Sequence, residues 1–135
     1  MTWNEILEHL RAAFAVIDEE EGKAVLGWRV GAAFYTQVVE SASAFGESWL
    51  RLTSIVGQRA DFCAERALEH NLTLAIGSLA FAGDSLVLAH LLPLAGLGRP
   101  QLDRALMLLA HEAARLGGHA TPRRPLVQLA DHFAD

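Results

Sequence analysis

Residues 79–88 read LAFAGDSLVL, which is two apolar runs separated by a Gly-Asp pair. Such a pair between apolar runs is typical of the two-residue turn of a β-hairpin. The pattern therefore predicts antiparallel strands over residues 73–82 and 85–92. Pro93 ends the second strand, because proline has no N–H group to donate to the strand ladder.

The segment upstream of this hairpin predicts more sheet. Between residues 23 and 56 the apolar residues recur with a period of two, which is typical of strands whose side chains alternate between two faces. This period predicts three strands, over residues 24–30, 32–41 and 48–57, with glycine-containing turns between them.

Helical spacing flanks these strands. Thr2 and Glu5 have the spacing of a capping box, and the apolar residues after them recur at helical intervals as far as Ile17. A short second helix is predicted over residues 59–70, and a long last helix over residues 99–116. The residues expected to face inward from the second helix are Phe62, Cys63, Ala67 and Leu68.

The predicted order is therefore helix, three strands, helix, two strands, helix. Strand runs interleaved with single helices indicate the α+β class with an antiparallel sheet and packed helices. We assign residues 1–116 to this one domain and residues 117–135 to a C-terminal tail. The tail has apolar spacing for a short helix, which alone is too short to be stable and either docks or frays.

Composition excludes several classes of protein. The chain has 135 residues, 52% of them hydrophobic, so it is one folded domain with apolar surface beyond the needs of its core. That excess predicts a homodimer or a partner interface. The net charge of −5 argues against direct nucleic-acid binding, because phosphate backbones need clustered basic residues. The sequence shows no signal peptide and no membrane span, which predicts a cytoplasmic protein.

Patterns for catalysis and metal binding are incomplete. His111 and Glu112 begin the zinc-protease helix pattern, but Arg115 stands where the second histidine is needed, and Glu112 and Arg115 are expected to form an ion pair. The acidic run at residues 18–21 lacks the spacing of a calcium loop. We therefore predict no enzyme, no metal site and no cofactor.

Large apolar side chains are the remaining candidates. They are numerous for five short strands, and they fit either a packed core or a surface that receives a strand or helix of a partner. Without deciding between core and interface, we select six candidate partner-binding residues: Trp28, Phe34, Val38, Trp49, Leu88 and Leu106.

The chain resembles the type III secretion chaperone-like fold, and within it the bacterial YbjN family. The resemblance is densest over residues 67–72, 76–88 and 91–97, which contain a helix ending at an asparagine, the Gly-Asp hairpin and a Leu-Pro-Leu link. It covers residues 1–116. It implies a non-enzymatic, often dimeric protein, and secretion chaperones of this fold bind an extended, partly unfolded client segment along apolar patches without nucleotide.

Three functions stay open. The first is a chaperone-like or regulatory protein-binding module that holds a partner segment as a dimer. The second is a small-molecule-binding domain with a pocket between sheet and helices, for which His90, Arg51 and Asp84 are candidate polar groups. The third is a bona fide class I type III secretion chaperone.

Overall fold

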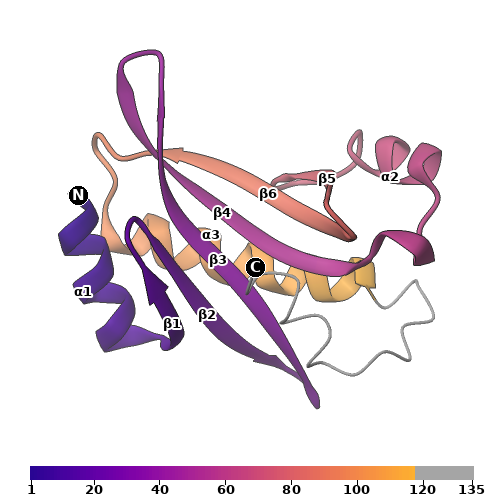
Figure 1. Ribbon diagram of the computed structural model, residues 1–135, viewed down its shortest axis with the longest axis horizontal. Coiled ribbons are helices and arrows are strands. Elements are labelled where there is room, and N and C mark those ends of the chain that lie inside the picture. The colour runs from indigo at the N-terminus through magenta and orange to yellow at the C-terminus, as the bar shows by residue number, and fades with distance from the viewer. Residues whose placement is uncertain (118–135) are drawn as a thin grey trace.

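A computed structural model describes residues 1–117 as one sheet with helices around it (Figure 1). Thr2 caps the first helix as predicted: its hydroxyl accepts the Glu5 N–H, and the Glu5 carboxylate accepts the Thr2 N–H. In chain order the elements are α1 (Trp3–Ala13), β1 (Ala15–Glu20), β2 (Lys23–Val30), β3 (Ala33–Ala44), β4 (Glu47–Gln58), the 3-10 helix η1 (Arg59–Asp61), α2 (Ala64–His70), β5 (Ser78–Ala82), β6 (Ser85–Pro93) and α3 (Arg99–Gly117).

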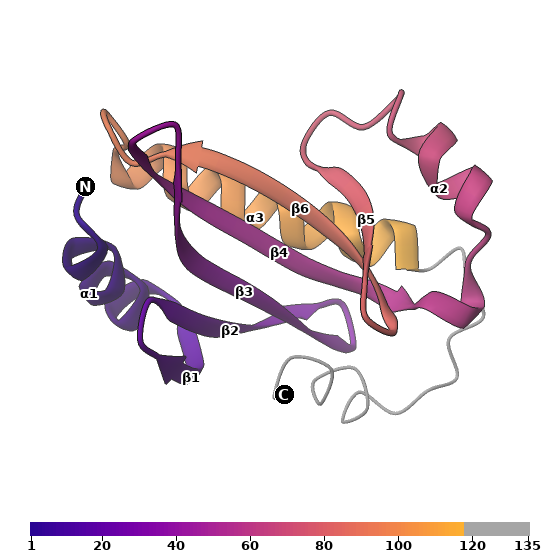
Figure 2. The same ribbon diagram turned by 45° about the horizontal axis from the view of Figure 1, so that its top comes forward.

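The sheet has six strands in the order β1-β2-β3-β4-β6-β5, and every neighbouring pair is antiparallel. α3 runs along one face of it, and α1 lies on the same side beside β1 and β2 (Figures 1 and 2). A hydrogen bond of 2.6 Å between His9 Nε2 and Asp103 Oδ1 joins these two helices. α2 stands beside β5 at the far end. We call the opposite side the helix-free face, because none of the helices in residues 1–117 covers it.

The α+β class with an antiparallel sheet is confirmed, and so are the Gly-Asp hairpin and the long last helix. The strand count before α2 was wrong, because four strands precede it and not three. The first helix stops at Ala13, and residues 15–20 form β1, in which Val16 pairs with Leu26. Spacing alone fits a helix as far as Ile17, but pairing with β2 places Val16 on the core side.

Two further boundaries differ from the prediction. The helix expected over residues 59–70 is split into η1 and α2 by an extended backbone at Phe62 and Cys63. The strand expected over residues 73–82 begins only at Ser78, after Gly77 with a φ of +75°. Of the predicted tail, residues 118–135 lie outside the described part of the chain, so their expected short helix stays a prediction.

The core lies between the helices and the side of the sheet that they cover. Its largest fully buried side chains come from α1, from the helix-facing positions of the strands and from α3; among them are Ile6, Leu10, Leu26, Leu50, Leu52, Leu88, Leu102, Leu106 and Leu109. Every strand from β2 to β6 contributes to this layer. Burial of these leucines and isoleucines is therefore what holds α1 and α3 on the sheet.

One buried polar group sits in the middle of this apolar layer. The Gln37 side chain on β3 is completely buried, and each of its amide atoms has a partner. The Trp28 indole N–H donates to its oxygen at 2.8 Å, while its nitrogen donates to the Ser54 hydroxyl at 2.9 Å and to the Leu106 carbonyl at 3.1 Å. Gln37 thus connects three neighbouring strands with α3.

Candidate partner-binding surfaces

The structure divides the six candidate residues between the two sides of the sheet. The sequence analysis left open whether each candidate belongs to the core or to an interface. Leu88 and Leu106 have no exposed surface and belong to the core. Trp28 is half-buried on the same side, where its ring packs against Phe14 with 5.6 Å between ring centroids. Its indole N–H donates a hydrogen bond to the side-chain oxygen of Gln37. Trp28 is therefore also held by packing and hydrogen bonding within the domain.

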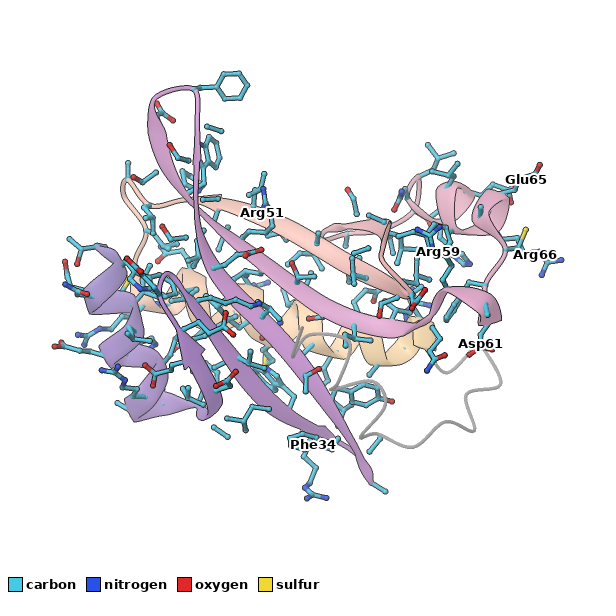
Figure 3. The ribbon with its side chains drawn as sticks, viewed as in Figure 1. Phe34, Arg51, Arg59, Asp61, Glu65 and Arg66 are labelled. Atoms are coloured by element: carbon cyan, nitrogen blue, oxygen red, sulfur yellow. The ribbon has the colours of Figure 1, made fainter. Side chains whose placement is uncertain are left out.

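Phe34, Val38 and Trp49 lie on the helix-free face. The strand register pairs Phe34 with Arg29 near one end of β3, whereas Trp49 pairs with Ala42 near the other end. Phe34 packs over Gly27, where an added Cβ would lie 2.5 Å from the phenylalanine ring. Val38 between them is only 3% exposed. Figure 3 shows Phe34 at the end of the sheet remote from α1. The three residues share a face but do not form one cluster.

Large apolar side chains that the sequence analysis did not select are exposed at the surface. Within residues 1–117 they are Ile17, Phe45, Leu68, Leu72, Leu91, Met107 and Leu108. Leu68 was expected to face inward and is 67% exposed instead, and Cys63, which lies in the extended segment before α2, is exposed too. Ala67 is buried as predicted.

Two groups of surface side chains form candidate contact surfaces; they contain members of this exposed set and, in the first group, the half-buried Trp49. The first, which we call the hairpin patch, consists of Phe45, Trp49 and Leu91. Phe45 is at the tip of the β3–β4 hairpin and 96% exposed, and Trp49 and Leu91 share the helix-free face on the paired strands β4 and β6. The second, the α2 patch, consists of Leu68 and Leu72, which are four residues apart and 67% and 88% exposed.

The hairpin patch has a charged border. Arg51 stands directly opposite Leu91 in the strand register, and its guanidinium lies 3.7 Å from the Glu40 carboxylate. An exposed pair of this kind adds little stability. An apolar centre with a polar rim is nevertheless the usual composition of a protein interface.

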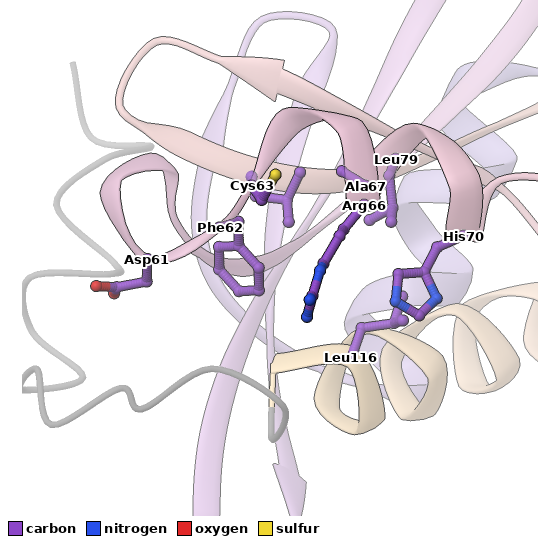
Figure 4. Close-up of a pocket in the computed structure, with 9 residues that line it drawn as sticks. Asp61, Phe62, Cys63, Arg66, Ala67, His70, Leu79 and Leu116 are labelled. Atoms are coloured by element: carbon purple, nitrogen blue, oxygen red, sulfur yellow. The ribbon is translucent and has the colours of Figure 1, made fainter.

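The polar groups considered for a small-molecule site are only partly brought together. Arg51 and His90 line one surface cavity of about 540 Å³ beside the end of β5, but Asp84 is in the hairpin turn and does not line it. Burial lowers the pKa of His90, so its neutral form is favoured. A second cavity, of about 490 Å³, lies between α2 and the end of α3 (Figure 4).

The expected ion pair of Glu112 and Arg115 is confirmed, and the hydrogen bonds from Arg115 lower the pKa of Glu112. The neighbouring His111 is bonded through Nδ1 to the Met107 carbonyl. No group of three or more histidine, cysteine, aspartate or glutamate side chains in residues 1–117 is arranged to hold a metal ion. In the same part of the chain, no helix is both long and apolar enough to cross a membrane.

By sequence, the chain matches no protein-family model and no curated protein. Its fold does match solved structures. One chain of the HopA1-SchA chaperone-effector complex superposes on it with a TM-score of 0.61, covering 86% of this chain and 94% of that chain at 12% sequence identity. At 12% identity the likeness shows the fold alone. It supports the type III secretion chaperone-like fold that the sequence resembles. The finer resemblance to the YbjN family stays a prediction.

Proposed function

We propose that this chain is a non-enzymatic, chaperone-like or regulatory module that holds an extended or partly unfolded segment of a partner protein in the cytoplasm. The observation that carries the proposal is the exposure of seven large apolar side chains in residues 1–117, at 39% to 96% of their surface. Apolar patches of this kind mark interaction sites on soluble proteins. The fold neighbour, which comes from a chaperone-effector complex, supports the same class of function.

The hairpin patch is the proposed site for the partner segment. An extended chain presents every second side chain to one side, so an apolar partner segment can place such residues against Phe45, Trp49 and Leu91 in turn. Of the six residues selected from the sequence, Trp49 is the one that belongs to this patch, and Phe34 extends the same face towards β2. The partner is a protein, and neither nucleic acid nor membrane is part of the proposal.

Binding of an unfolded chain tests this function. We expect the protein to bind reduced, carboxymethylated α-lactalbumin, which is permanently unfolded, and not the native form of that protein. The double variant Trp49→Ser and Leu91→Ser is expected to bind at least about tenfold more weakly, because buried apolar contacts dominate interface energies. Fluorescence anisotropy of the labelled probe measures both.

A matched control removes a similar apolar area elsewhere. Met107 and Leu108 are 45% and 39% exposed on the outer side of α3, so the double variant Met107→Ser and Leu108→Ser is expected to bind like the unmodified protein. Equal binding of the native and unfolded probes, or equal weakening in both double variants, would contradict the proposed site.

The α2 patch is the proposed contact between two copies of the chain. Leu68 lies in the last turn of α2 and Leu72 in the hydrogen-bonded turn that follows it, so both leucines are exposed at the same end of the helix, and a symmetric dimer would bring together the same patch of both copies. We expect light scattering after size exclusion to give twice the mass of the chain. The double variant Leu68→Ser and Leu72→Ser is expected to give the mass of a single chain and to keep its binding of the unfolded probe. A monomeric unmodified protein would remove the dimer from the proposal.

The finer alternatives within this function are a YbjN-type regulator and a bona fide class I type III secretion chaperone. They differ in what surrounds the gene, since a secretion chaperone is expected beside the gene of a secreted substrate. Both alternatives use the same patches, so the binding tests apply to either.

A further inference from the structure

The cavity between α2 and α3 has a closed apolar floor. Four of the side chains that line it are at least 93% buried: Ala67 of α2, Leu79 of β5, Leu86 of β6 and Leu116 of α3. Phe62 forms one wall, packed so closely on Gly57 that an added Cβ there would lie 2.6 Å from its ring. A volume of about 490 Å³ lies within the range of small-ligand sites.

The mouth of this cavity carries a cation with no partner among the described residues. The Arg66 side chain extends over the opening between Phe62 and His70 (Figure 4) and forms no ion pair or side-chain hydrogen bond within residues 1–117. His70 lies beside Arg66 at the mouth of the cavity (Figure 4). Asp61, the one carboxylate among the described residues that line the cavity, points away from its centre (Figure 4).

From this geometry we propose that the cavity binds a small amphiphilic carboxylate, such as a medium-chain fatty acid. The alkyl chain occupies the apolar floor, where each buried methylene removes apolar surface from water. The carboxylate lies at the mouth and accepts two parallel hydrogen bonds from the Arg66 guanidinium, whose planar donors match a carboxylate. The site shares no residue with the hairpin patch or the α2 patch, so it does not depend on the function proposed above.

Calorimetric titration of the full chain with hexanoate, octanoate and decanoate, each below its micelle concentration, tests the alkyl part. The affinity is expected to rise about fourfold for each added methylene, since a buried methylene contributes a nearly constant increment. Equal affinities for the three acids, or no binding, would overturn the proposal. Binding of a short apolar peptide with an acidic residue, without binding of any of the acids, would also overturn it, because the occupant would then be a partner side chain.

The head group is tested with Arg66→Gln and its control Arg104→Gln, which removes an exposed arginine of α3 that does not line the cavity. Arg66→Gln is expected to weaken decanoate binding about tenfold and to leave binding of the uncharged decanol unchanged. Arg104→Gln is expected to change neither. Both residues are exposed, so both variants are expected to fold, which far-UV circular dichroism checks. Equal decanoate affinity in the two variants would refute the role of Arg66.

Cys63 supplies a second readout in the unmodified protein, because it is the single cysteine of the chain, is exposed and lines the same cavity. Bound decanoate is expected to slow the reaction of its thiol with Ellman's reagent in proportion to the occupancy measured by calorimetry. In the urea-unfolded chain the same concentration of decanoate is expected to have no effect on the rate. Calorimetric binding without any protection of Cys63 would place the ligand elsewhere and overturn the proposal.

Discussion

We expect the Leu106→Ala substitution to lower the free energy of unfolding by about 2–5 kcal/mol. Leu106 has no exposed surface and lies on the side of α3 that faces the sheet. Alanine would remove its apolar contacts and leave a cavity, since helix and sheet cannot close fully around a smaller side chain. Urea denaturation followed by circular dichroism measures the loss.

The adjacent Met107 provides the control for this prediction. Its side chain is 45% exposed, so Met107→Ala is expected to change the free energy of unfolding by only about 0.5 kcal/mol. Because both substitutions introduce the same residue at neighbouring positions of one helix, helix propensity affects them almost equally. A loss at Leu106 no larger than the loss at Met107 would show that the core is not where the structure places it.

The second large effect is expected at Gln37. Gln37→Glu is expected to destabilise the protein by about 3 kcal/mol or more at neutral pH. The new carboxylate would be buried, and it could still accept from Trp28 and Ser54, but it would face the Leu106 carbonyl oxygen, to which the amide now donates at 3.1 Å. An ionised group has no proton to give to that oxygen.

Acid is expected to restore part of this lost stability. Burial raises the pKa of a carboxyl group, so the folded variant would bind its proton at a higher pH than the unfolded chain does. Its stability relative to the unmodified protein should therefore increase as the pH falls through the folded-state pKa, where the protonated group can donate to the Leu106 carbonyl again. Urea unfolding at pH 8, 6 and 5 measures this difference.

Gln37→Leu is the control for the charge. It keeps a similar volume but leaves the Trp28 and Ser54 groups without their partner, at a cost of about 1–3 kcal/mol for a buried group. This cost is expected to be the same at all three pH values. If Gln37→Glu lost no more stability than Gln37→Leu, and if its loss did not vary with pH, the buried position of this side chain would be contradicted.

Much of the fold was predictable because it depends on local chemistry. The Gly-Asp turn, the capping box at Thr2 and Glu5 and the ion pair of Glu112 and Arg115 each involve residues within a few positions of one another. Their partners are set by the geometry of one turn or one helix, whatever the rest of the chain does. The period of two likewise identified the strands that pair in the centre of the sheet.

The candidate surfaces were much less predictable. Spacing could not tell whether Val16 and Ile17 continue α1 or form β1, because Ile17 continues the helical spacing and only pairing with β2 selects the strand. Leu68 reads as an inward residue on a continuous helix, but the short α2 buries only Ala67 and leaves Leu68 exposed. Leu88 and Trp49 are both apolar strand residues, yet Leu88 faces the helices and Trp49 lies on the helix-free face.

By itself, the sequence determined the α+β class, the antiparallel hairpin and the long last helix, because turn chemistry and periodicity act over a few residues. Only the tertiary structure decided which apolar side chains form the core and which remain exposed, since this depends on which face α1 and α3 cover. It also brought Gln37 together with Leu106, which is 69 residues away, and placed Arg66 over an apolar cavity. Such contacts join distant parts of the chain, and no local pattern of residues encodes them.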